Sequence, residues 1–105
     1  MLTVQEVLTR CKRSLVQDYG AHLRGVVLYG SMARGEATPE SDIDLLVLLD
    51  SPFDYFQELR RIVNLLYPVQ LESDYLISAK PAPLEAYKRG QLQLYRNAQH
   101  EGLQI

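Results

Sequence analysis

The sequence predicts a small α/β (α+β) fold in which helices pack on one face of a small mixed β-sheet. Segments with apolar residues at helical spacing alternate with short strand-like runs, in the order αβαβαβα. Two of these runs, residues 25–29 and 41–50, are dense in Val and Leu and are typical of buried strands. Neither a repeat nor a linker interrupts the order, so residues 1–105 are expected to form a single domain.

The first two elements are expected to be a helix over residues 3–19 and a strand over residues 25–29. Thr3 and Glu6 have the spacing of a capping box, in which each side chain bonds to the other residue's backbone N–H. Apolar residues then recur at helical intervals, namely Val4, Val7, Leu8, Cys11 and Leu15. Gly20 is expected to end the helix, and Gly30 the strand.

The middle of the chain is expected to form a strand, a helix and a further strand. Residues 31–40 contain Gly35 and Pro39 and predict one turn of helix followed by a loop before the strand over 41–50. Ser51 and Pro52 have the pattern of a helix start, and the apolar stripe behind them predicts a helix that ends before Pro68. Residues 69–78 alternate between apolar and polar side chains, which predicts a third strand.

The last part of the chain is expected to be mostly helical. Two short helices are predicted around residues 83–89 and 91–100, after the break at residues 80–83. Gly102 is then expected to turn the chain into a terminal strand over residues 103–105.

Composition excludes several classes of protein. The chain is 47% hydrophobic and 23% charged, as in ordinary globular domains, and no apolar run is long enough for a membrane helix. A net charge of -2 argues against a long nucleic acid as the main substrate. Cys11 is the only cysteine and no secretion signal begins the chain, which favours the reducing cytoplasm.

Two carboxylates stand at the start of the second predicted strand. Asp42 and Asp44 alternate with apolar residues, so both face the same side of the sheet. Burying two unpaired charges close together is unfavourable, and a cation is therefore expected beside them. In the third predicted strand Glu72 and Asp74 share one face, and a third carboxylate can join the first two if the strands are neighbours. Such a cluster of hard oxygen ligands suits Mg²⁺.

A Gly-Ser pair follows the first predicted strand. Gly30 permits a sharp turn and close approach by a ligand, and Ser31 is expected at a helix N-terminus, where free N–H groups suit a phosphate. Arg34 lies one turn further and can reach the same phosphates with its planar guanidinium. These residues are therefore candidates for binding a nucleoside triphosphate.

Residues 30–47, GSMARGEATPESDIDLLV, carry a resemblance to a known family. Gly-Ser, ten intervening residues and Asp-x-Asp before an apolar strand resemble the signature of the minimal nucleotidyltransferases, a branch of the DNA polymerase β-like superfamily. The resemblance implies a nucleotidyltransferase-like fold, with Asp42 and Asp44 as metal ligands and Gly30 and Ser31 binding the nucleotide. It also implies a carboxylate on the next strand as third ligand or general base. That role is assigned to Asp74, with Glu72 as the alternative.

The same resemblance implies a reaction and its cofactors. A pair of Mg²⁺ ions would assist an acceptor hydroxyl in attacking the α-phosphorus of ATP, with release of pyrophosphate. The proton of that hydroxyl would pass to Asp74, directly or through water. Nothing in the motif reads the base of the nucleotide.

The length resembles that of the minimal nucleotidyltransferase antitoxins paired with HEPN-domain toxins, which are ribonucleases. The expected function is therefore a protein adenylyltransferase that silences its HEPN toxin by transferring AMP to a tyrosine hydroxyl, within a hetero-oligomer of the two. Two alternatives stay open at this point. The chain can neutralise a toxin by masking it without catalysis, or it can modify a small molecule such as an aminoglycoside.

Overall fold

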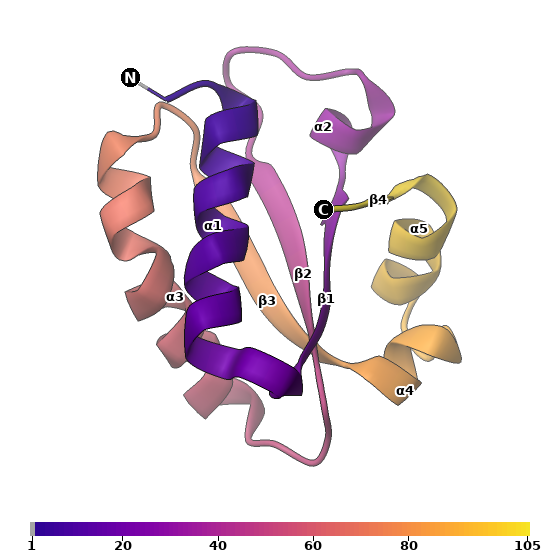
Figure 1. Cartoon of the computed structure of the whole chain (residues 1–105). Coiled ribbons are helices and arrows are strands. Elements are labelled where there is room, and N and C mark those ends of the chain that lie inside the picture. The colour runs from indigo at the N-terminus through magenta and orange to yellow at the C-terminus, as the bar shows by residue number, and fades with distance from the viewer. Residues whose placement is uncertain (1) are drawn as a thin grey trace.

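The computed structural model describes residues 2–105, which form a four-stranded sheet flanked by helices (Figure 1). The helices are α1 (Val4–Tyr19), the 3-10 helix η1 (Gly20–His22), α2 (Ser31–Arg34), α3 (Tyr55–Glu72), α4 (Leu84–Lys88) and α5 (Gln93–Glu101). The strands are β1 (Leu23–Tyr29), β2 (Ile43–Leu49), β3 (Ile77–Pro83) and β4 (Leu103–Gln104). None of the helices in these residues is long and apolar enough to cross a membrane.

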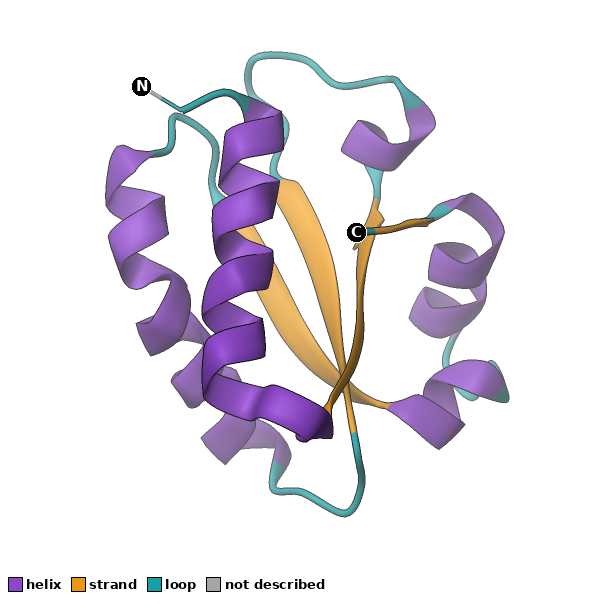
Figure 2. Ribbon diagram, in the orientation of Figure 1, coloured by secondary structure: helices purple, strands orange, loops and turns teal. Residues whose placement is uncertain are grey.

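The sheet is mixed, with strand order β3-β2-β1-β4. β1 pairs antiparallel with both β2 and β4, and β2 pairs parallel with β3. Figure 2 shows the three longer strands side by side, with the short β4 beside β1 at the end of the chain. The predicted α/β fold class with a small mixed sheet is confirmed, but helices cover both faces of the sheet and not one as predicted.

The two long helices cover one face of the sheet. The capping box of α1 forms as predicted, because Thr3 N–H donates to Glu6 Oε1 at 2.9 Å and Glu6 N–H donates to Thr3 Oγ1 at 3.1 Å. α1 and α3 bury their apolar stripes against alternate residues of β1 and β2, and together they form the main core. Its buried members include Val7, Cys11, Leu15, Val26, Leu28, Ile43, Leu45, Val47, Ile62 and Leu66.

The opposite face of the sheet is covered by the two short C-terminal helices, which lie on the other side in Figure 1. A second cluster of buried side chains joins that face to α5, with α4 packed at its edge. Its buried members are Val27, Tyr29, Leu46, Leu48, Ala82, Tyr95 and Ala98. Successive side chains of β2 therefore alternate between two packed faces of the sheet, and Asp44 lies on the face of the second cluster.

The predicted third strand over residues 69–78 is wrong. α3 begins after Asp54, whose side chain accepts from Gln57 N–H at 3.0 Å, and it continues through Pro68 to Glu72. Pro68 is exposed and costs the helix one backbone donor, but Val69 is buried in the core one turn beyond Leu66. Burial of that continued apolar stripe outweighs the local preference of proline to end a helix.

The third strand lies instead at residues 77–83, and it includes the predicted break at residues 80–83. The last turn of α3 fixes where this strand starts, because Gln70 Oε1 accepts from Ile77 N–H at 2.7 Å and Gln70 Nε2 donates to Tyr75 O at 3.0 Å. β3 contains two prolines and two alanines, which have little intrinsic strand preference. Pairing with β2 supplies what local propensity lacks.

Candidate active site

The two halves of the motif meet at one end of the sheet. β1 ends at Tyr29 directly before the Gly-Ser pair, and β2 begins directly after Asp42. Because these strands are antiparallel, the end of β1 lies beside the start of β2, with Tyr29 paired to Asp44. The structure therefore brings Gly30, Ser31 and Asp44 together as the sequence predicted.

Gly30 is in close contact with the Asp44 carboxylate. Its φ of +77° and ψ of -158° lie in a region that essentially only glycine adopts. A Cβ atom built on Gly30 would stand 2.5 Å from Asp44 Oδ2, closer than nonbonded atoms approach. The backbone conformation therefore requires glycine here, and a side chain would also force the Asp44 carboxylate to move.

Ser31 begins the short helix α2, and it is half-buried. The N–H groups of Ala33 and Arg34 both donate to the carbonyl of Gly30 at 3.1 Å, which closes the first turn. Gly35 ends α2 in the left-handed conformation, with φ +73°. The turn between the strands is thus held by its own hydrogen bonds, with the Ser31 hydroxyl at its start.

The two carboxylates of the motif repel each other. Asp42 is exposed just before β2, and Asp44, the second residue of β2, is half-buried. Burial, followed by the charge of Asp42, raises the pKa of Asp44, whereas the charges of Lys80 and Arg34 act in the opposite direction. Positive charge near this pair relieves an unfavourable interaction, which is the electrostatic condition for binding a cation.

The structure does not bring a third carboxylate to this pair. Asp74 lies exposed in the bend between α3 and β3, where Ser73 Oγ accepts from Tyr75 N–H at 3.0 Å. Glu72 belongs to α3 and forms an ion pair of 2.7 Å with Arg10 of α1. Among residues 2–105, no three His, Cys, Asp or Glu side chains are grouped so that they could hold a metal ion. The expectation of three converging acids depended on the strand over 69–78 and is wrong with it.

Sequence reasoning missed the side chains that do stand beside Asp44 on the neighbouring strand. In the parallel pair of β2 and β3, Asp44 is matched with Ser78 and Leu46 with Lys80. Ser78 and Lys80 therefore share the face of Asp44. Ile62, Leu66 and Val69 continue the helical spacing past Pro68. That spacing is the signal for a longer helix, and therefore for a third strand that begins later and includes Ser78 and Lys80.

Arg34 is held by two acidic residues. Its Nε lies 2.7 Å from Glu36 Oε1, and its Nη1 lies 3.1 Å from Glu101 Oε2 at the end of α5. These ion pairs tie α2 to the C-terminal helix. These pairs use Nε and Nη1 and leave Nη2 available, and contact between Arg34 and a phosphate stays a prediction.

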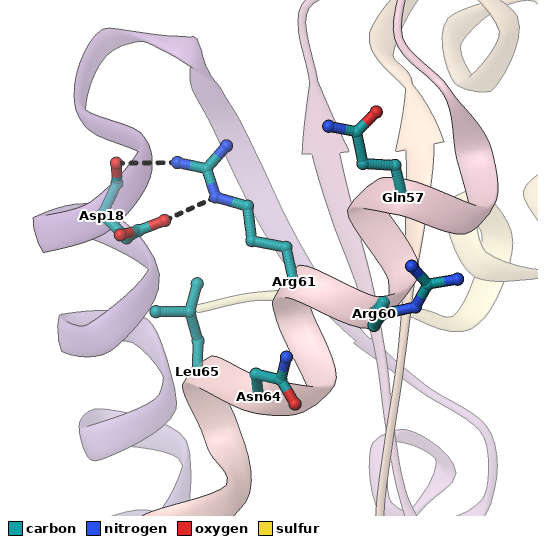
Figure 3. Close-up of a pocket in the computed structure, with 6 residues that line it drawn as sticks. All are labelled: Asp18, Gln57, Arg60, Arg61, Asn64 and Leu65. Carbon is teal, nitrogen blue, oxygen red and sulfur yellow. Dashed lines mark hydrogen bonds and ion pairs between the residues drawn. The ribbon is translucent and has the colours of Figure 1, made fainter.

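A pocket of about 420 Å³ lies away from the motif, between the end of α1 and the start of α3 (Figure 3). Arg61 crosses it, with Nε 2.6 Å from Asp18 Oδ2 and its guanidinium 4.2 Å from the centre of the Tyr19 ring. Its other lining residues are Gln57, Arg60, Asn64 and Leu65. These side chains join the two long helices on the face opposite Asp44, so we assign the pocket no part in the motif's chemistry.

Comparisons with known proteins agree with the motif. The profile of the family described as "Nucleotidyltransferase domain" matches residues 8–98. Two proteins of Methanocaldococcus jannaschii, both named "Putative protein adenylyltransferase", are similar in sequence. One is 38% identical over 71 residues, covering 64% of this chain and 71% of the relative. The other is 30% identical over 77 residues, covering 73% of this chain and 77% of the relative.

A solved structure shares the fold. It is a chain from the crystal structure of a mutant of the toxin–antitoxin MntA-HpeT. The match has a TM-score of 0.59 at 19% identity and covers 100% of this chain and 72% of the other.

Proposed function

This chain belongs to the nucleotidyltransferase domain family, and from that premise we propose that it transfers AMP from ATP to a hydroxyl of a partner protein. One observation carries the proposal. The backbone of Gly30 lies against the carboxylate of Asp44, so a phosphate bound at the Gly-Ser turn is next to the two acids. A nucleotide's phosphates and a cation would therefore share one site.

Asp42 and Asp44 are the residues that would hold a divalent cation. Their oxygens are the hard ligands that Mg²⁺ prefers, and their mutual repulsion favours its binding. A Mg²⁺ ion held there would supply positive charge to neutralise the phosphates. With only two carboxylates at the site, the remaining ligands would come from the nucleotide and from water.

Gly30 and Ser31 would hold the nucleotide. The absence of a side chain at Gly30 lets the Asp44 carboxylate lie against the Gly-Ser turn, and the Ser31 hydroxyl can donate a hydrogen bond to a phosphate bound there. The acceptor oxygen forms a bond to the α-phosphorus while the bond from that phosphorus to the bridging oxygen breaks, releasing pyrophosphate. The hydroxyl proton passes to water. Most of the rate would come from positioning and electrostatics.

The acceptor in this proposal is a tyrosine hydroxyl of a HEPN-domain toxin in the cytoplasm, with the two proteins forming a hetero-oligomer. Two findings support a protein acceptor. The sequence relatives are named as protein adenylyltransferases, and a chain of the same fold comes from a toxin–antitoxin complex. The free Cys11 and the proposed use of ATP fit a cytoplasmic location.

The test is mass spectrometry of a HEPN-domain toxin that forms a complex with this chain, after incubation with the protein, ATP and Mg²⁺. We expect the toxin to gain the mass of one or more AMP groups and to lose ribonuclease activity. The variant carrying Asp42→Asn and Asp44→Asn should form the same complex without the mass gain. A confirmed complex in which the wild-type protein leaves the toxin's mass unchanged would contradict the proposal.

One observation favours a second function, which is neutralisation by masking without catalysis. The site holds two acids rather than three, and a weaker metal site is less suited to catalysis. The same double variant separates the two functions. Full neutralisation by that variant would favour masking, whereas loss of neutralisation with retained complex formation would favour transfer of AMP.

A further inference from the structure

The register of the sheet points to a third functional side chain, and we propose that the ammonium group of Lys80 binds the phosphates of the nucleotide. This inference rests on the proposed function. It adds that a positive side chain takes the place on β3 where a third carboxylate was expected. The site would accordingly bind its nucleotide with less dependence on Mg²⁺.

The placement of Lys80 follows from strand pairing. β2 and β3 run parallel and in continuous register from Ile43 with Ile77 to Leu49 with Pro83. Paired residues on neighbouring strands point to the same face, and so do residues two apart on one strand. Lys80 is paired with Leu46, two residues beyond Asp44, and it therefore stands diagonally beside that carboxylate on the same face.

The surroundings keep the amine available. Further along this face, Leu46, Leu48 and Ala82 are buried in the cluster under α5, whereas Lys80 is exposed. Within residues 2–105 Lys80 forms no ion pair. A long flexible side chain at the border between a packed face and an open carboxylate pair can extend along the strand toward that pair.

The charges decide what such a lysine can do. Lys80 is one of the charges that act on Asp44, and it lowers the pKa which burial and Asp42 raise. Two carboxylates and one ammonium leave a single net negative charge, whereas a third acid would leave three. Three carboxylates would require two divalent cations before a triphosphate could approach. Two carboxylates with an ammonium group need fewer divalent cations, because the ammonium itself attracts phosphate oxygens.

Calorimetric titration with a non-hydrolysable ATP analogue tests the proposal. Titrations would be made in Mg²⁺ and in excess EDTA, on the wild-type protein and on Lys80→Gln. Lys88→Gln is the matched control, because Lys88 is an exposed lysine of α4, away from Asp44. We expect Lys80→Gln to bind the analogue about tenfold more weakly in EDTA, as loss of one charge-assisted contact implies. Lys88→Gln should bind as the wild type does.

A substitution that reverses the charge of Lys80 gives an independent measurement. Lys80→Glu supplies the missing carboxylate, so with nucleotide present we expect it to bind more Mn²⁺ per chain than the wild type, as counted by electron paramagnetic resonance. It should bind no analogue in EDTA. Equal affinities of Lys80→Gln and Lys88→Gln in EDTA would overturn the role of Lys80.

The outcomes separate this inference from the proposed function. If the wild type binds the analogue in Mg²⁺, Asp42→Asn abolishes that binding and Lys80→Gln does not weaken it in either buffer, only the inference about Lys80 fails. If the wild type binds no analogue in either buffer, the proposed function fails and this inference fails with it. Because Lys80 is exposed, its substitutions are compatible with the fold, which thermal melting would verify.

Discussion

Single residues at the motif are under more than one physical constraint. Gly30 must adopt a backbone conformation closed to other residues, and it must leave space for Asp44 Oδ2. Asp44 in turn is partly buried beside a second carboxylate, which makes its ionised form unfavourable in the unliganded protein. Strain and repulsion of this kind cluster at functional sites, where a ligand relieves them.

Gly30→Ala is expected to lower the free energy of unfolding by about 3 kcal/mol, because strained backbone and a steric clash add. Gly35→Ala is the control, since its φ of +73° is also left-handed but no atom lies within 4 Å of the added Cβ. That variant should lose only about 1 kcal/mol. Urea denaturation measures both. Equal losses for the two variants would contradict the contact between Gly30 and Asp44.

Asp44→Asn is expected to raise the melting temperature of the unliganded protein at neutral pH. The folded-state pKa of Asp44 is raised above 3.8, so the folded protein holds this proton more tightly than the unfolded chain does. The fold is therefore destabilised as pH rises through that folded pKa, and the amide removes the effect. Below pH 3.8 wild type and variant should melt alike.

Asp50 provides the control of opposite sign. A hydrogen bond from Arg24 lowers the pKa of Asp50, so its ionised form stabilises the fold above the unfolded pKa. Asp50→Asn should therefore melt at a lower temperature than the wild type at neutral pH, with a difference that fades as pH falls. Melting curves of both variants across a pH series make the comparison. A lower melting temperature for Asp44→Asn at neutral pH would contradict the account.

At the scale of elements, local sequence signals determine some helices and strands, whereas long-range packing determines others. α1 was predictable because its cap and its apolar stripe are both encoded within residues 3–19. The end of α3 carries conflicting signals, since Pro68 is a strong local stop signal whereas Val69 continues the apolar stripe, and packing of Val69 in the core decides for the longer helix. β3 has weak strand propensity and exists through its pairing with β2, which no local pattern expresses.

Pro68→Ala is expected to stabilise the protein by about 1–3 kcal/mol, because it restores a backbone donor inside α3 and removes the ring from a helix interior. Pro39→Ala, in the exposed loop before β2, is the control and should change stability little. The measurement is the midpoint of urea unfolding. If Pro68 instead ended the helix, as a strand over residues 69–78 would require, the substitution would bring no such gain.

At the scale of the whole molecule, the topology explains which part of the site was predictable. Gly30, Ser31 and Asp42 lie in the segment that joins β1 to β2, and Asp44 lies on β2, so their spacing along the sequence encodes their meeting in space. The third position lies on β3, beyond the whole of α3, and depends on the register of a parallel pair. An error in where α3 ends therefore placed Asp74 on that strand, whereas Ser78 and Lys80 stand beside Asp44 there.

We propose that the Gly-Ser turn and the Asp-x-Asp strand form one site for a nucleotide and its cation. A crystal structure of the protein grown with Mg²⁺ and a non-hydrolysable ATP analogue tests it most directly. We predict phosphates against Gly30 and Ser31, with the cation bound by Asp42 and Asp44. Nucleotide bound elsewhere, as in the pocket beside Arg61, with the two carboxylates free of any cation, would contradict the claim.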